Sequence, residues 1–394
     1  MASYTILKPV RDAMASDWER EVVSSLWTGT FLFSFVAIGL YSTLASWIRL
    51  KWLVPGVYVF FALTFVAFYT VYTQFPSAID TWLGYGYYMW VSVFALFHLS
   101  VFWSYMSQVY TKDQAMRLFA MIATGISAGA ILGGSVAALF AEELGESILV
   151  LISAGLLLLA IPFILYLDVG VSRTHGTGDD ERKLPEKTES RFYDGFLKLV
   201  NTPMLLGIAI FILLLTGINA FAYFVMYDLL KELTPDREIR TQILARRDLA
   251  INVSTFVIGI FVTNRLVKWL GMKAALPLLP VLVAVLLVVL AGAPMLATVI
   301  GFEIVRKVVN YAITKPSREM LFTQVDTSAR FQTKPVIDVI CYRGGDVAWA
   351  WVYTLVTSKL GASLSQAAMI WAGIAVVWAA VGYWLGVRYT RNNG

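Results

Sequence analysis

The sequence predicts an all-α protein that crosses a membrane several times. Of its 394 residues 58% are hydrophobic and 14% are charged, and its mean hydropathy is +0.70. A soluble domain is about half apolar and a quarter charged. Apolar runs long enough to span a bilayer recur along the chain, without the alternating pattern of outer-membrane strands. Because backbone groups in lipid must bond within their own segment, these runs predict helices.

The apolar runs define about eleven spans. In chain order we expect them at residues 23–48, 53–75, 82–109, 114–142, 146–168, 203–229, 249–270, 273–293, 295–314, 335–358 and 364–388. Basic clusters fall in every second connection, which predicts a cytoplasmic side. The segment Lys231–Asp248 is the exception, because it is expected as an outer loop and is nevertheless basic.

This alternation places the C-terminus in the cytoplasm and the N-terminus outside, although the first residues lack the features of a signal peptide. The segment Ala2–Leu7 resembles the last turns of a helix that begins upstream. With that first helix restored, we expect twelve spans and both ends in the cytoplasm.

A polar, charge-rich segment at residues 170–192 is typical of a flexible linker. We expect an N-terminal half at 1–168, with its first helix truncated, a cytoplasmic linker at 169–200 and a C-terminal six-helix half at 201–394. The halves also echo each other, because Gly39–Gly56 and Gly259–Pro277 each contain a glycine, a basic pair and a proline. Parallel repeats occur in two-fold transporters. The expected architecture is therefore of the major facilitator type.

Several function classes lack their usual residues. The single cysteine, Cys341, excludes an internal disulfide and a thiolate metal cluster, and two histidines supply a metal site poorly. The sequence contains no P-loop and no nucleophile elbow. We therefore expect no metal, no cofactor and no enzymatic activity. The basic residues lie mostly in loops, where membrane topology explains them, so no nucleic-acid partner is expected.

Ionisable residues inside the spans are the strongest functional signal, because they are costly in a bilayer and normally pair or line a water-filled path. Glu303, Arg306 and Asn310 follow at spacings of three and four and share a helix face. The next span carries Asp338, Arg343 and Asp346. Two interpretations stay open: a structural ion pair that holds helices together, or a central cavity that binds or gates a charged solute.

Two further polar residues lie in apolar surroundings. Asn219 is expected either to bind solute or to form a hydrogen bond between helices. His98 is either a proton carrier or a buried neutral imidazole with a partner. Small residues at every fourth position predict a packing face at Gly125, Gly129 and Gly133.

Charges near the ends of the spans have a different expected role. The segment Lys315–Lys334 is expected as a cytoplasmic loop whose charges are solvated or form salt bridges between the halves. Gating or contacts between the halves are expected of Lys112, Arg117, Arg318 and Glu319.

Three stretches resemble the nucleotide transporter family, the ATP/ADP translocases of plastids and intracellular bacteria. Tyr4–Asp12 is similar to the family's first-helix motif, Val101–Gly134 to the junction of its fourth and fifth helices, and Lys315–Asp346 to its late signature. The late matches are Pro316, Arg318, Glu319, Met320, Lys334, Ile337, Asp338, Arg343 and Gly344. The resemblance implies a carrier of the major facilitator type from a divergent bacterial branch.

The resemblance also implies site residues and shows two departures. The family's first-helix cation falls on Arg11, and the lysine before its Ile-Asp pair falls on Lys334. Tyr88 replaces a carboxylate of the family, and Gly344–Asp346 replaces Gly-Lys-Ser, which exchanges a cation for an anion.

A polyanion such as ATP requires several fixed cations. This chain offers Lys8, Arg11, Arg306, Lys334 and Arg343. Nearby acids offset much of that charge, so a less charged anion or a zwitterion fits equally well.

The sequence therefore predicts a secondary transporter of an anionic metabolite, with nucleotides the leading candidate, that works by alternating access in a bacterial inner membrane. Its partners are the solute and the bilayer, and we expect a monomer. A proton-coupled carrier of a non-nucleotide and a non-transporting scaffold or sensor are the alternatives. The expected solute-binding residues are Lys8, Arg11, Asn219, Arg306, Asn310, Lys334, Asp338 and Arg343. Proton coupling is expected of Glu303, Asp338, Asp346 and His98.

Overall fold

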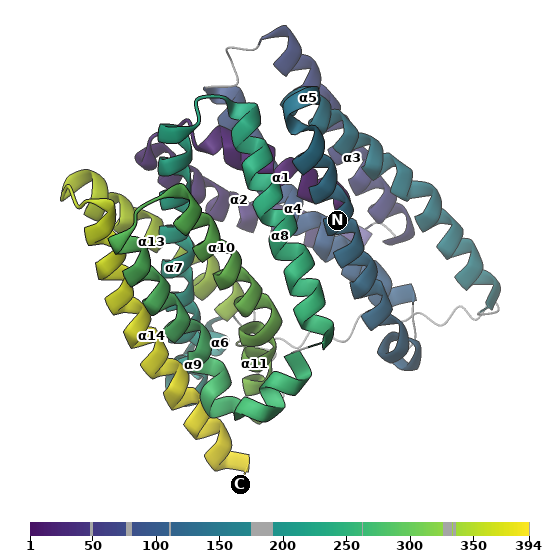
Figure 1. Cartoon of the computed structure of the whole chain (residues 1–394). Helices are drawn as coiled ribbons and strands as arrows, with labels where there is room; N and C mark the ends of the chain where they lie inside the picture. The colour runs from purple at the N-terminus through teal and green to yellow at the C-terminus, as the bar shows by residue number, and fades with distance from the viewer. Residues whose placement is uncertain are drawn as a thin grey trace. The chain divides into compact units, whose positions relative to one another are not determined.

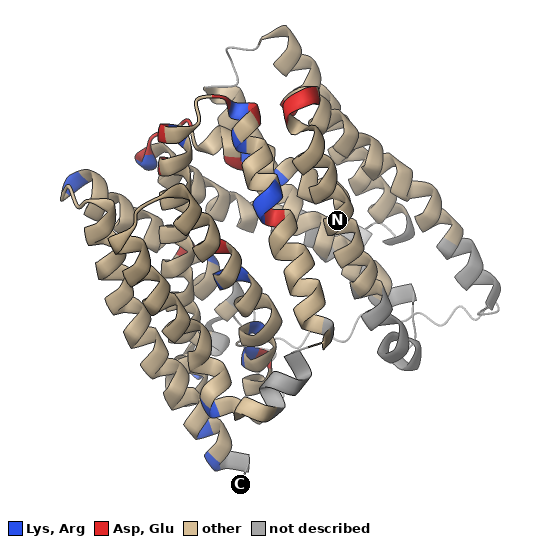
Figure 2. Ribbon diagram, in the orientation of Figure 1, with Lys and Arg blue, Asp and Glu red and all other residues tan. Residues whose placement is uncertain are grey.

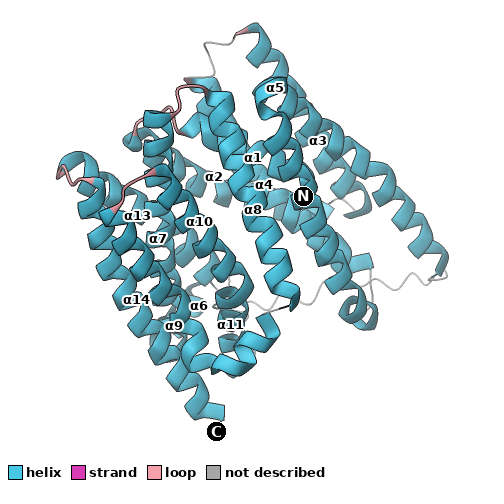
Figure 3. Ribbon diagram, viewed as in Figure 1, coloured by secondary structure: helices cyan, strands magenta, loops and turns pink. Residues whose placement is uncertain are grey.

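The structure is a computed structural model, and in the part of the chain that it describes, helices are the regular structure (Figure 1). It describes residues 1–47, 50–75, 81–109, 112–174, 192–261, 263–325, 333 and 336–393. All regular structure in these residues is helical, as Figure 3 shows. The expected all-α fold class is therefore confirmed.

Within each described range, few residues separate one helix from the next. In chain order they are α1 (Ala2–Ala15), α2 (Arg20–Trp47), α3 (Leu50–Gln74), α4 (Trp82–Val109), α5 (Lys112–Thr174), α6 (Phe192–Asn201), α7 (Pro203–Leu233), α8 (Arg237–Phe261), α9 (Thr263–Gly292), α10 (Leu296–Val309), α11 (Lys315–Leu321), α13 (Gly345–Thr354) and α14 (Leu364–Asn393). Wider π-helical turns at Asn310–Thr314, Ile337–Gly344 and Leu355–Lys359 extend α10 and flank α13, and a short 3₁₀ turn at Phe322–Gln324 follows α11.

Several helices are long and apolar enough to cross a bilayer. Within the described residues these segments are Trp52–Gln74, Trp82–Trp103, Thr124–Tyr166, Pro203–Leu233, Trp269–Gly292 and Leu364–Arg391. Large apolar side chains on their surfaces, such as Leu63, Leu159 and Val376, are exposed, which suits contact with lipid. Figure 2 shows long stretches of ribbon without charge.

Two glycines break long helices where the sequence predicts a boundary between spans. Gly145 in α5 has φ 75° and ψ 164°, and Gly271 in α9 has φ 67° and ψ 168°. This backbone conformation is accessible essentially only to glycine. The chain can therefore reverse direction after 114–142 and again after 249–270 within what is otherwise continuous helix.

Three segments differ from the expected loops. The expected outer loop Lys231–Asp248 is wrong, because α7 continues to Leu233 and α8 begins at Arg237. The expected linker 169–200 is helical at both ends, where it belongs to α5 and α6, and residues 175–191 lie outside the described part. Lys315–Leu321 forms α11 rather than a loop. Hydropathy missed these segments because a charged helix is stable when its charges are paired.

Contacts divide the chain into two compact units. Unit 1 contains residues 1–19, 28–182 and 234–249. In it α1 packs against α4 and α5, and α3 packs against the same two helices. Leu7 of α1, Phe65 of α3, Phe94 of α4 and Leu149 of α5 belong to one buried apolar core.

Unit 2 contains residues 20–27, 183–233 and 250–394. Its central element is α7, which packs against α10, α13 and α14, while α14 lies along α9 (Figure 1). Trp371 donates a hydrogen bond from Nε1 to the carbonyl oxygen of Gly217 at 2.8 Å, and Trp349 donates one to Leu213 at the same distance. These bonds satisfy the indole N–H groups, and Trp371 is fully buried in the core of the unit.

Two short segments belong to the other unit than their place in the sequence predicts. Residues Thr234–Leu249, the start of α8, belong to unit 1, and Arg20–Trp27, the start of α2, belong to unit 2. Ala245 of α8 is fully buried against Ala137 and Ala138 of α5. Small side chains allow such close approach of helices.

The predicted glycine face of α5 packs against α1. A Cβ at Gly133 would lie 2.7 Å from Cα of Ala2, whereas one at Gly125 would meet nothing within 4 Å. We expect Gly133→Leu to lower the free energy of unfolding by about 1–3 kcal/mol, because overpacking displaces backbone. Thermal unfolding in detergent measures this effect, with Gly125→Leu as the matched control. Equal melting temperatures for the two variants would contradict the packing.

Candidate functional site

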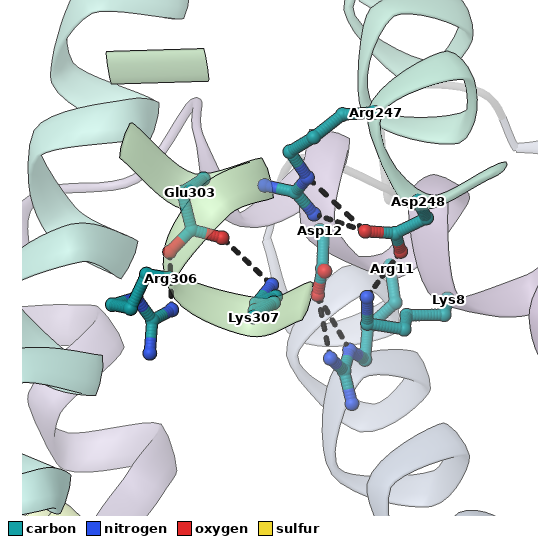
Figure 4. Close-up of polar contacts among 8 residues, drawn as sticks. All are labelled: Lys8, Arg11, Asp12, Arg247, Asp248, Glu303, Arg306 and Lys307. Carbon is teal, nitrogen blue, oxygen red and sulfur yellow. Dashed lines mark hydrogen bonds and ion pairs between the residues drawn. The ribbon is translucent and has the colours of Figure 1, made fainter. Parts of the chain in front are cut away.

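A buried cation forms the centre of a polar cluster in unit 2, the Arg306 cluster (Asn219, Glu303, Arg306, Lys307). Arg306 and Glu303 are each 2% exposed. Arg306 donates hydrogen bonds to the carboxylate of Glu303 and to the side-chain oxygen of Asn219, which is on α7. Lys307 Nζ lies 2.7 Å from the other oxygen of Glu303. Figure 4 shows Glu303 bonded to both cations.

Two π-helical segments follow this cluster in the sequence. After α10 the backbone widens into a π-helix that begins at Asn310, which is 8% exposed, and Arg343 lies in the second π-helical segment. Wide turns inside α-helices occur frequently at functional sites. Asp346, in the first turn of α13, lies within electrostatic range of Arg343 and Arg306. Helix α7 therefore packs against α10, which carries Glu303 and Arg306, and against the segment that carries Arg343 and Asp346.

A glycine explains how α13 comes close to α7. A Cβ at Gly345 would lie 3.0 Å from the side chain of Leu213 and closer still to the hydroxyl of Thr216. Because Asp346 follows directly, this contact holds the backbone of Asp346 close to α7.

A second group of charges in unit 1, the Arg11 cluster, consists of Lys8, Arg11, Asp12, Arg247 and Asp248. Arg11 Nη2 lies 2.6 Å from the carboxylate of Asp12. Asp248 of α8 forms ion pairs with both Lys8 and Arg247, the latter at 2.8 Å. Both pairings are drawn in Figure 4. Among these five residues three cations meet two acids, so the cluster has an excess of one positive charge.

Tyr88, which stands where the resemblance implies a carboxylate, contacts Arg11 of this cluster. The guanidinium of Arg11 lies over the Tyr88 ring at 5.2 Å from its centroid, and Arg11 Nη1 donates a 3.1 Å hydrogen bond to Ser92. A cation over an aromatic face is attracted to the ring electrons. The aromatic face and the neighbouring Asp12 therefore supply what a carboxylate at Tyr88 would provide.

A third set of charges links the first turn of α8 to the end of α1. Asp17 accepts hydrogen bonds from Arg237, at 2.7 Å, and from Arg240. Arg240 is only 3% exposed. We call these three residues the Asp17 clamp. All of them belong to unit 1, although Asp17 and Arg237 are 220 positions apart in the sequence.

The remaining predicted residues have separate positions. His98 is 6% exposed, its Nδ1 lies 3.2 Å from the carbonyl oxygen of Phe94, and its ring stacks on the Phe94 ring. This arrangement fits a buried imidazole with a partner, and proton transfer there stays a prediction. Lys334 and the side chains of Lys112, Arg117 and Asp338 lie outside the described residues.

The expected loop position of Arg318 is wrong. Arg318 belongs to α11, is 7% exposed, and lies 3.3 Å from Glu319. The structure also places acids that the sequence reasoning did not select beside the predicted cations. These partners are Asp12 for Arg11 and Asp248 for Lys8. Asp17 instead binds Arg237 and Arg240, which the sequence reasoning did not select either. The basic stretch Lys231–Asp248, which departed from the topology rule, was the signal that could have indicated them.

No family model and no curated protein matches the sequence. Solved structures are similar to it over nearly the full length. The chain shares its fold with solved membrane transporters. A nucleoside transporter, NupG, has TM-score 0.61 at 14% identity, covering 97% of this chain and 98% of that one.

Two bacterial structures agree with this result. A bacterial homologue of the human lysosomal transporter Spinster, in an inward-facing and unoccupied conformation, has TM-score 0.62 at 12% identity and covers 99% of this chain and 96% of its own. A bacterial metal transporter has TM-score 0.57 at 12% identity, with 98% of each chain covered. Likeness at this level of identity establishes the fold, and the narrower nucleotide transporter family stays a prediction.

Proposed function

We propose that the protein is a secondary transporter that moves a small anionic solute by alternating access. The single observation that carries this proposal is the buried Arg306, held between an acid and an amide in a helix that widens four residues later. Burying a cation in an apolar protein costs free energy. Such a cation is therefore normally paired with an acid or lines a path for a solute. Its Nε has no hydrogen-bond partner among the described residues, so a donor is available beside the paired ones.

The charge balance favours an anion of low charge. Three of the predicted cations, Lys8, Arg11 and Arg306, are each already bound to a carboxylate. An anionic solute would have to replace such a carboxylate as the partner of the guanidinium or ammonium group. This exchange keeps the cation neutralised in both the loaded and the empty protein, which limits the electrostatic cost of releasing the solute.

The nucleotide interpretation is the finer form of this proposal. It is supported by the sequence resemblance, and the fold is shared with a nucleoside transporter. Acids beside most of the cations favour a solute less charged than ATP. A monocarboxylate, a dicarboxylate and inorganic phosphate are therefore tested beside ATP and ADP.

The test is counterflow in proteoliposomes. Vesicles containing the purified chain are preloaded with one unlabelled compound, and uptake of the same labelled compound is followed, with protein-free vesicles as the blank. We expect exchange of at least one of the anions. Arg306→Gln should reduce it about 10- to 100-fold, because a charge-assisted hydrogen bond contributes about 1.5–3 kcal/mol.

Arg391→Gln provides the matched control, because Arg391 is an exposed arginine near the end of α14. It should exchange solute at the unchanged rate. Exchange of a neutral nucleoside but of no anion would contradict the anionic substrate. Absence of exchange for every compound in a folded, monodisperse sample would contradict transport of these solutes.

A further inference from the structure

A buried carboxyl group outside both clusters has one oxygen bonded and one without a partner. Glu146 follows Gly145 at the turn inside α5 and is 1% exposed. Its Oε1 accepts a 2.7 Å hydrogen bond from the hydroxyl of Thr241 on α8. Its Oε2 has no hydrogen-bond partner among the described residues. A buried carboxylate oxygen without a donor is strongly disfavoured.

A second residue that lines the same cavity as Glu146 also has an unbonded polar atom. The hydroxyl of Tyr87 is also buried without a partner in the described part of the chain. Glu146 and Tyr87 line the same cavity, of about 10 Å³, with Met14, Phe68 and Tyr72 among its other walls. That volume holds no more than about one water molecule. A neutral carboxyl, which carries a donor on one oxygen, fits this site better than a carboxylate does.

The charged and titratable groups around Glu146 come from several elements. From α8 these are Arg237 and Glu238, and from the turn after α1 it is Asp17. Tyr87 of α4 lies within electrostatic range, and Tyr69 and Tyr72 of α3 line the cavity. On α5 itself, Glu142 and Glu143 are exposed. Among these groups, the cation within electrostatic range of Glu146 is Arg237. Its Nη2 already lies 2.6 Å from the carboxylate of Asp17.

We infer that Glu146 is a proton-binding site that controls the Asp17 clamp. With a proton bound, Glu146 is neutral and leaves Arg237 to Asp17, so the first turn of α8 stays attached to the end of α1. When the proton leaves, the new carboxylate competes with Asp17 for Arg237 and weakens the clamp. The bond that breaks is O–H of the carboxyl, and the proton passes to water.

This inference does not depend on which solute is carried. It gives the protein a site that links proton binding to the attachment of α8, a helix whose later residues belong to unit 2. In a carrier that works by alternating access, this link would couple a proton to the conformational change.

Infrared difference spectroscopy tests the proton site directly. Spectra of the full chain in lipid are recorded at acidic and alkaline pH. We expect a protonated carboxyl band that disappears at alkaline pH, is missing in Glu146→Gln and is retained in Glu143→Gln. A band that is the same in Glu146→Gln would overturn the site. Should Glu146→Gln not fold, Thr241→Val, which removes only the hydrogen bond to Oε1, must shift the pH at which the band titrates.

A nitroxide on Glu19→Cys, in a Cys341→Ser background, tests the link to the clamp. Glu19 is exposed and lies two residues after Asp17. We expect the label to become more mobile at alkaline pH, and to stay immobile at every pH when Glu146→Gln is added. An identical pH response in both proteins would overturn the link. Both readouts remain valid if the counterflow assay detects no anion exchange, so the two proposals can fail separately.

Discussion

Replacing Arg306 by alanine is expected to lower the free energy of unfolding by about 3–5 kcal/mol and to abolish solute exchange. The physical reason is that Glu303 is 2% exposed, so the variant leaves a buried carboxylate with one cation, Lys307, in place of two. Removing one partner of a buried ion pair typically has a cost of this size. Melting temperature in detergent and counterflow in vesicles measure the two effects.

A double-mutant comparison separates a structural ion pair from a binding site. In Glu303→Gln with Arg306→Gln, no buried charge lacks a partner, so most of the lost stability should return. Exchange should not return, because the cation that holds the solute is absent. Lys307→Gln, at a more exposed position, should have the smaller effect on stability. Recovery of both stability and exchange in the double variant would show that the pair has only a structural role.

Asp17→Ala is expected to destabilise the protein by about 3–5 kcal/mol. Asp17 is the carboxylate that binds both Arg237 and Arg240, and Arg240 is 3% exposed. Without Asp17, the buried guanidinium of Arg240 loses the acid that neutralises it. The start of α8 should then separate from α1, which lowers the melting temperature and exposes residues 237–249 to protease.

Glu19→Ala is the matched control for this prediction. Glu19 is an exposed acid two residues away, and surface substitutions of this kind change stability by less than about 0.5 kcal/mol. If the two variants melt at the same temperature, the clamp does not stabilise α8. Adding Arg240→Met to Asp17→Ala should recover part of the stability, because the buried charge is removed as well.

Hydropathy predicts most helices of this protein, because a backbone in lipid must form its own hydrogen bonds wherever it lies. Gly145 and Gly271 were also expected boundaries, since both lie between apolar runs. The same reasoning did not find the first half of α8, which was expected as a loop. This half carries the charges visible in Figure 2, and polar composition alone indicates a loop. The helix is compatible with those charges because Asp17 binds Arg237 and Arg240, and Lys8 binds Asp248.

The candidate site was predictable only in part. The spacing of Glu303 and Arg306 places them on one helix face by geometry alone, and the structure pairs them. Their partner Asn219 is 87 positions from Arg306. Lys8 and Asp248 are 240 positions apart. Residues this far apart in the sequence share no local pattern. They come together only because α7 lies against α10 and the start of α8 lies beside α1.

The amino-acid sequence by itself determined that this chain is helical, apolar on its outer surfaces and charged at a few positions within its spans. These properties follow from local chemistry: the cost of unbonded backbone in lipid and the cost of buried charge. Only the tertiary structure decided which acid neutralises which cation and which carboxyl oxygen has no partner. Ion pairs are short-range contacts, and two residues more than 200 positions apart meet only after the helices between them have packed.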